Sequence, residues 1–174
     1  EPTKAASLIV EQPDFGTDIL CSAIMDFPIF TTRFVLDAEP TKAASLIVEQ
    51  PDFGTDILCS AIMDFPGDRH LNFTCSTQAQ LHQRMVFQGT EGRLELKVPF
   101  NPYPGLQDPE IVLYPGAALG DAHGERIEVE NLDQYRLQVE AMNRAILGEE
   151  AWSIPRSDIM AQARAVEMVF NSRI

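Results

Sequence analysis

Residues 57–78 read ILCSAIMDFPGDRHLNFTCSTQ, and this stretch decides the fold because polar and apolar residues alternate on both sides of a turn signal. Alternation with a period of two is typical of a strand with one buried face. Gly67-Asp68 are residue types that favour a turn. We therefore predict strands over residues 57–65 and 70–78. Their apolar faces consist of Ile57, Cys59, Ala61, Met63 and Phe65 and of Leu71, Phe73, Cys75 and Thr77.

Further short strands are expected toward the C-terminus. Residues 84–88 and 93–98 flank Gly89-Thr90-Glu91-Gly92, which is a hairpin signal. Two more strands, residues 110–114 and 125–130, follow a proline-rich loop at residues 99–109.

The spacing of apolar residues then becomes helical. Asp133 can cap one helix that ends near Gly148, and a second helix follows. The expected buried stripes are Tyr135, Val139, Met142 and Ile146 on the first helix and Ile159, Ala163, Val166 and Phe170 on the second. Strands followed by helices predict an α+β fold, with an open, mainly antiparallel sheet and helices packed on one face.

Residues 1–28 recur letter for letter as residues 39–66. We interpret residues 1–28 as a duplicated strand hairpin and residues 29–174 as the sheet domain proper. Both copies compete for one place in the sheet, and the second has the shorter loop to close. The first copy is expected at a sheet edge or exchanged with another chain. This predicts a homo-oligomer, intertwined or edge-paired through residues 1–28.

Composition excludes several classes of partner. The formal net charge of -13 disfavours binding to nucleic acid, which requires a basic surface. The sequence contains no apolar run long enough to suggest a membrane span, and no secretory signal at its start. The cysteines lack zinc-site spacing, so we expect reduced thiols and a cytoplasmic location.

Few residues suggest chemistry. The sequence contains no GxGxxG turn, Walker loop, HExxH or GxSxG motif, and its three histidines are scattered. Tyr135 is a possible general acid, but its apolar stripe favours core packing. We therefore assign no catalytic, cofactor-binding or metal-ligating residue. One polar strand face remains a candidate surface for a substrate pocket or another subunit, namely His70, Asn72, Thr74, Ser76 and Gln78.

The order of several motifs resembles the Gfo/Idh/MocA oxidoreductase family over residues 29–174, and looks closest to NADP-dependent xylose-type or dihydrodiol dehydrogenases. The motifs are RFVLDAEPTKAAS (33–45), DFGTDILCSAIMDFPG (52–67), FTCSTQ (73–78), QRMVFQGTEGRLEL (83–96), PFNPYPG (99–105), DQYRLQVEAMNRAILG (133–148) and SDIMAQARAVEMVFNSR (157–173). The resemblance implies the carboxy-terminal domain of such an enzyme. In the family, helices cover one face of this domain's sheet, and the other face meets partner subunits and helps shape the substrate site.

This sequence departs from the family pattern where the chemistry would be. The family binds NAD(P) in an amino-terminal Rossmann domain and uses a lysine in a Glu-Lys-Pro motif. Neither a phosphate-binding turn nor that motif occurs here, so the Rossmann domain is expected to be absent. The helix that should carry catalytic polar residues is represented only by its tail, residues 29–38. We expect no cofactor in this chain and no activity of the chain alone.

Three functions remain open. The favoured one is a non-catalytic, self-associating domain or rearranged remnant of an NAD(P)-dependent sugar oxidoreductase. The second is the substrate-binding or oligomerisation half of an enzyme that a separate nucleotide-binding chain completes. The third is a module that binds a small molecule or a protein on the polar strand face.

Overall fold

The structure is a computed structural model that describes residues 5–11, 21–52, 54–80, 82–102, 108–116, 120, 123–130 and 132–174, with the backbone alone for residues 5–11 and 21–24. The elements are β1 (Ala5–Glu11), α1 (Cys21–Leu36), β2 (Lys42–Gln50), β3 (Thr55–Phe65), β4 (Arg69–Ser76), β5 (His82–Gly89), β6 (Gly92–Lys97), β7 (Glu110–Pro115), β8 (Glu125–Ile127), α2 (Gln134–Leu147) and α3 (Arg156–Phe170).

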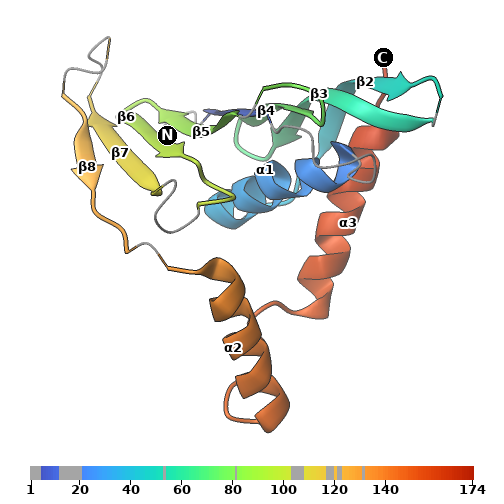
Figure 1. Cartoon of the computed structure of the whole chain (residues 1–174). Coiled ribbons are helices and arrows are strands. Elements are labelled where there is room, and N and C mark those ends of the chain that lie inside the picture. The colour runs from blue at the N-terminus through green and yellow to red at the C-terminus, as the bar shows by residue number, and fades with distance from the viewer. Residues whose placement is uncertain are drawn as a thin grey trace.

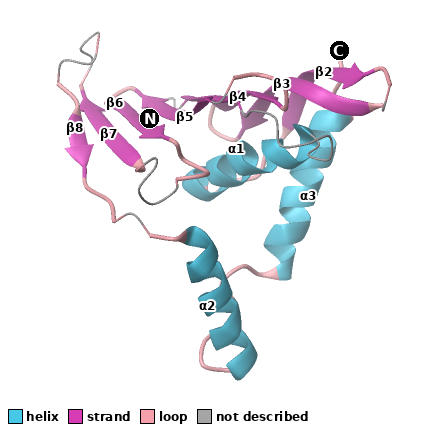
Figure 2. Ribbon diagram, viewed as in Figure 1, coloured by secondary structure: helices cyan, strands magenta, loops and turns pink. Residues whose placement is uncertain are grey.

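The strands form one sheet in the order β2-β3-β4-β1-β5-β6-β7-β8. All neighbours are antiparallel except β1 and β4, which are parallel. Helices α1 and α3 lie against one face of the β2–β4 part, and α2 projects away from the sheet (Figures 1 and 2). The predicted α+β class and the mainly antiparallel sheet are confirmed.

The β3–β4 hairpin supplies the centre of the core, as the alternating pattern predicted. Its register pairs Met63 with Leu71 and Cys59 with Cys75. All four side chains are completely buried beneath α1 and α3. Burying each large apolar side chain contributes about 1.5–3 kcal/mol, so this hairpin is a major source of the sheet's stability.

The letters CSAIMDFP occur twice and adopt two different structures. Residues 21–28 begin helix α1, whereas the same letters at residues 59–66 finish strand β3 and enter a turn. The prediction of a strand hairpin is therefore wrong for residues 21–28. Residues 1–4 and 12–20, which also belong to the predicted hairpin, lie outside the described residues.

The residues that follow each copy decide its structure. IFTTRFVLDA follows the first copy and extends the helical spacing, so that Met25, Ile29 and Thr32 share one completely buried face of α1. Gly67 and Asp68 follow the second copy with φ of 79° and 56°, and they turn the chain back into β4.

The strand from the first copy occupies an interior place in the sheet. The backbone of β1 pairs with β4 on one side and with β5 on the other. Its location differs from the expected sheet edge, because both of its hydrogen-bonding edges are used within the same chain. The first copy thus joins the β2–β4 part of the sheet to the β5–β8 part.

The outer edge of β2 is partly covered by the C-terminus. Ser45 N–H donates to the carbonyl of Ser172 (2.9 Å), and Ile174 N–H donates to the carbonyl of Ser45 (3.1 Å). Arg173 also forms an ion pair with Glu49 of β2 (2.6 Å). This edge therefore offers fewer unpaired backbone groups for strand addition than a bare edge would.

Arg33 connects α1 to α3. Its guanidinium donates to Glu39 at 2.7 and 2.8 Å, to Asp158 at 2.6 Å and to Gln162 at 3.0 Å. The side chain is only 4% exposed. The hydrogen bond to Glu39 is the largest cause of a raised pKa of Arg33, so the guanidinium stays charged.

The helices bury different faces from those expected. Asp133 caps α2, and Gly148 ends it in a left-handed conformation, as predicted. None of the residues of α2 is buried, however, so its apolar stripe does not join the core of this chain. Helix α3 buries Ala161, Ala165 and Val169. The expected stripe of Ile159, Ala163, Val166 and Phe170 lies beside that row and lines a partly exposed groove. The row of alanines faces the core instead, because their small side chains allow α3 to pack closely against α1 and β2.

Candidate functional site

The face of the β2–β4 sheet opposite the helices carries an exposed patch of apolar and hydroxyl side chains. The ladders bring Leu46, Ser60 and Thr74 into one row across the three strands. The next row contains Ala44, Ile62 and Asn72. We call these six residues, together with Ile174, the open-face patch.

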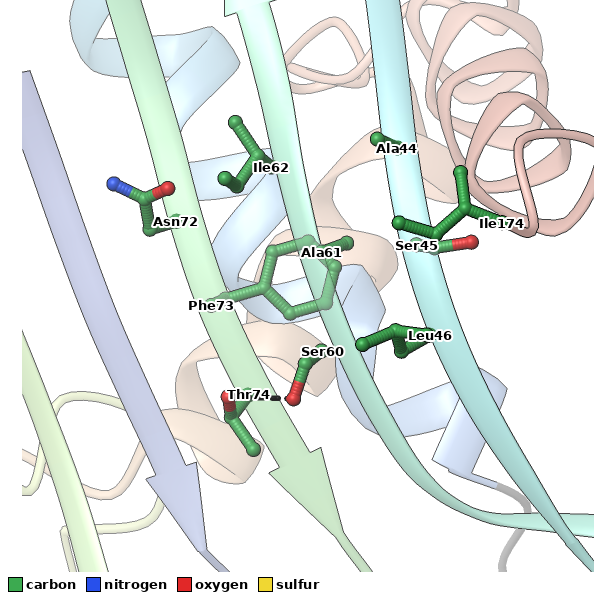
Figure 3. Close-up of a pocket in the computed structure, with 10 residues that line it drawn as sticks. All are labelled: Ala44, Ser45, Leu46, Ser60, Ala61, Ile62, Asn72, Phe73, Thr74 and Ile174. Carbon is green, nitrogen blue, oxygen red and sulfur yellow. Dashed lines mark hydrogen bonds between the residues drawn. The ribbon is translucent and has the colours of Figure 1, made fainter.

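The patch surrounds a shallow hollow of about 320 Å³. Leu46 and Ile62 are more than half exposed at its floor, and Ile174 lies at its β2 side (Figure 3). The Ser60 and Thr74 hydroxyls are 2.9 Å apart and hydrogen-bond each other. These side chains can make apolar contacts and neutral hydrogen bonds, and none of the described side chains that line the hollow is ionisable.

The predicted polar face of β4 is only partly gathered into this site. Asn72 and Thr74 line the hollow. Ser76 is buried and donates to the Ile57 carbonyl (3.0 Å), and Gln78 donates to Gln50 beyond the strand end (3.0 Å). His70 lies at the opposite end of β4, where its Nε2 is 3.3 Å from Asp64 Oδ1.

A charged rim borders one end of the open-face patch. Lys42, Asp64 and His70 occupy one row of the β2–β3–β4 ladders, and Asp64 also accepts a hydrogen bond from Thr41 Oγ1 (3.2 Å). The patch therefore has an apolar centre and a polar border, the arrangement that is common in protein interfaces.

The described part of the chain assembles no metal centre from its acidic, cysteine and histidine side chains. No group of three or more His, Cys, Asp or Glu side chains there is arranged to hold a metal ion. His70 and His82 pair with opposite ends of β1, at Ala5 and Glu11, and His123 lies in a loop. Tyr135 is 62% exposed on α2, so the expectation of core packing is wrong for this residue.

Helices α1 and α2 each carry exposed apolar side chains. Phe30 and Phe34 of α1 stack with ring centroids 6.5 Å apart. Val139 and Met142 on α2 are 59% and 54% exposed. Exposed apolar side chains grouped on one helix commonly mark an interaction site.

The residues of β2 were missed as site residues, although the sequence contains a signal for them. Leu46, Ile47 and Val48 are three consecutive apolar residues in a strand, so apolar side chains point to both faces. Ile47 packs toward the core, whereas Leu46 and Val48 are 56% and 47% exposed on the open face. A continuous apolar run is typical of a strand covered on both faces.

Comparison with known proteins gives a relative and a set of structures. Over 120 residues the chain is 40% identical to an uncharacterized oxidoreductase, ORF334, of Rhizobium meliloti, a match that covers 69% of this chain and 36% of that protein. KijD10, a 3-ketoreductase from Actinomadura kijaniata solved with NADP and TDP-benzene, superposes with a TM-score of 0.78 at 19% identity, over 97% of this chain and 53% of that chain. The resemblance to Gfo/Idh/MocA-type oxidoreductases is confirmed.

Other solved structures share the fold. UDP-N-acetylglucosamine 3-dehydrogenase GnnA from Acidithiobacillus ferrooxidans superposes with a TM-score of 0.71 at 15% identity, over 97% of this chain and 54% of that chain. Aldose-aldose oxidoreductase from Caulobacter crescentus gives 0.74 at 11% identity, over 97% and 52%. The chain therefore spans about half the length of these Gfo/Idh/MocA-type structures.

No protein-family model matches the chain. Among the described helices, none combines the length and the apolar character that crossing a membrane requires.

Proposed function

We propose that this chain acts as a non-catalytic sheet domain of the Gfo/Idh/MocA type, and that it self-associates through the open-face patch. One observation supports this proposal above all. Helices cover one face of the β2–β4 sheet, while the other face exposes Leu46 and Ile62 beside hydroxyl groups. A second copy would remove these side chains from water, which contributes about 25 cal/mol per Å² of apolar area.

The lack of nucleotide-binding and catalytic motifs in these residues fits the same proposal. These 174 residues contain neither a GxGxxG turn nor a Glu-Lys-Pro motif. Phe27-Pro28 lie within helix α1, in the part where the resemblance implies catalytic polar residues. The chain is expected to bind no nicotinamide nucleotide in calorimetry, and clear binding would overturn the non-catalytic assignment. A reducing, cytoplasmic location belongs to the same proposal.

The exposed helix side favours a second candidate, in which a nucleotide-binding partner completes an oxidoreductase. Helix α2 is capped by Asp133 at its start and by Gly148 at its end, but none of its residues is buried. GnnA is named as a UDP-N-acetylglucosamine 3-dehydrogenase, so a completed enzyme of this type would act on a nucleotide-linked sugar or a related sugar. The two candidates differ in which apolar surface is occupied.

The mass of the protein in solution tests self-association, and one charge added to each surface shows which surface carries it. Ile62→Asp adds a carboxylate to the open-face patch, at a residue that is 53% exposed. Met142→Asp is a matched control on α2, because Met142 is 54% exposed. We expect an oligomer for the parent and for Met142→Asp, and a monomer for Ile62→Asp, by light scattering.

Other results would contradict the open-face assignment. A parent chain that is monomeric at all accessible concentrations removes the proposed self-association. Dissociation of Met142→Asp with an intact Ile62→Asp oligomer would assign assembly to the helix side. Point substitutions are preferable to deleting residues 1–28, because β1 forms part of the interior of the sheet.

A further inference from the structure

Cys59 of β3 and Cys75 of β4 form a pair of thiols on the helix-facing side of the sheet. The β3–β4 register places the two residues directly opposite each other. Both are completely buried and reduced. Their side chains hydrogen-bond each other. The open-face patch lies on the other side of the sheet and uses neither residue.

The ladder geometry brings these thiols within reach of a disulfide. Thr77 N–H donates to the Ile57 carbonyl at 3.1 Å in the same register. Hydrogen-bonded and non-hydrogen-bonded pairs alternate, so Cys59 and Cys75, two positions along, are also a hydrogen-bonded pair with Cα atoms about 5.5 Å apart. Disulfides join Cα atoms about 4.4–6.8 Å apart.

The same geometry makes such a bond easy to reduce. Directly opposite Cβ atoms lie about 4.5–5.5 Å apart, whereas a disulfide prefers about 3.5–4.5 Å. The hairpin must therefore tighten slightly when the bond forms, and strain of this kind favours reduction. The pair fits a reversible link better than a permanent staple.

We propose that Cys59 and Cys75 are a peroxide-responsive dithiol that closes into a reversible disulfide between β3 and β4. The Cys59 thiolate attacks one oxygen of hydrogen peroxide, the O–O bond breaks, and Cys59 sulfenic acid and hydroxide form. The Cys75 thiol then attacks the sulfenic sulfur, and water leaves as the S–S bond forms. In total, two thiols and one peroxide give one disulfide and two waters.

The surroundings of the pair lower the pKa of Cys59. The hydrogen bond with Cys75 lowers the pKa of Cys59, and the nearby charge of Arg173 acts in the same direction. Burial and the charge of Asp56 oppose this shift. Because the thiolate is the nucleophile, the net lowering of the pKa favours attack by Cys59.

The test is peroxide treatment of the folded chain, followed by alkylation of the remaining thiols and mass spectrometry. Trypsin places the three cysteines in separate peptides, residues 5–33, 43–69 and 70–84. We expect a peptide that links Cys59 to Cys75 and disappears on reduction. At about 10 µM protein, the amount of this intrachain disulfide should exceed that of disulfides between chains about 100-fold, because adjacent groups have effective concentrations of millimolar or more. Links mainly to Cys21, or mainly between chains, would overturn the proposal.

Exposed methionines supply an internal measure of the peroxide dose. Met142 and Met160 are 54% and 49% exposed, so they should convert to sulfoxide readily. If both methionines are oxidised while Cys59 and Cys75 are fully recovered as thiols, the proposal is wrong.

Single substitutions test the roles of the two thiols. In Cys75→Ala, Cys59 should accumulate as sulfenic acid that dimedone traps. In Cys59→Ala, Cys75 should oxidise more slowly. Cys21→Ser should form the same link as the parent. Circular dichroism checks that each variant folds. Unchanged oxidation of Cys75 in folded Cys59→Ala would exclude Cys59 as the first nucleophile.

Discussion

Replacing Arg33 with methionine is expected to weaken the connection between α1 and α3. Methionine retains much of the aliphatic volume but removes every hydrogen bond to Glu39, Asp158 and Gln162. The arginine side chain is 4% exposed, whereas Glu39 and Asp158 are 58% and 34% exposed. Both carboxylates can therefore regain water when the guanidinium is removed.

The exposure of the carboxylates sets the expected size of the effect. Removing one partner of a fully buried ion pair costs about 3–5 kcal/mol, and rehydration reduces this to about 2–4 kcal/mol for Arg33→Met. With a urea m-value of about 2 kcal/mol/M, the unfolding midpoint should fall by about 1–2 M.

Arg136→Met is the matched control for urea unfolding followed by circular dichroism. Arg136 is 61% exposed and lies 3.6 Å from Glu140 one helical turn away. An exposed pair of this kind contributes about 0.3–0.5 kcal/mol, so its midpoint should shift by about 0.2 M. Equal shifts for the two variants would refute the stabilising role of the Arg33 cluster.

The contribution of Arg33 should also depend on pH. The hydrogen bond from Arg33 lowers the pKa of Glu39 from its ordinary value of 4.5. A carboxylate with a lowered pKa stabilises the folded state above its unfolded pKa, and this stabilisation is lost as pH falls through the folded pKa. The difference between parent and Arg33→Met should therefore be constant above about pH 5 and narrow in acid.

Four further substitutions test other parts of the fold. Phe65 and Phe27 occupy the same position of the repeated segment, but they are 1% and 44% exposed. In urea unfolding, Phe65→Ala should therefore cost about 3–5 kcal/mol and Phe27→Ala about 1 kcal/mol. Equal losses of stability would contradict the helical placement of Phe27. Gly92→Ala should cost about 2–3 kcal/mol, because its φ is 150° and a Cβ would collide with the Tyr114 carbonyl; an unchanged midpoint would refute this. Asp133→Ala removes an acceptor for two backbone N–H groups. The opening free energy of the α2 amides, measured by hydrogen exchange, should therefore fall by about 1 kcal/mol. Unchanged exchange rates would mean that the cap contributes nothing.

The hairpin of β3 and β4 could be predicted from the sequence because its information is local. Alternation from Ile57 to Thr77 identifies the buried face, and Gly67-Asp68 identifies the turn. The caps of α2 at Asp133 and Gly148 are local for the same reason, since each depends on one residue type at a chain reversal or helix end.

The candidate site was predicted less well, because exposure depends on distant segments. Asn72 and Thr74 were found from the polar side of one strand, but their apolar neighbours Leu46 and Ile62 come from β2 and β3. The stripe of α2 also has the spacing of a core face, and no residue of α2 is buried. Periodicity identifies which side chains share a face, but it does not say what covers that face.

The sequence by itself therefore determined the α+β class, the β3–β4 hairpin and the family resemblance. Only the tertiary structure decided that CSAIMDFP is a helix at residues 21–28 and a strand at residues 59–66, and that β1 lies inside the sheet. The physical reason is that these letters satisfy both periods. Met25 shares a helical face with Ile29, whereas Met63 shares a strand face with Phe65. The flanking residues and the partners across the core select between the two conformations.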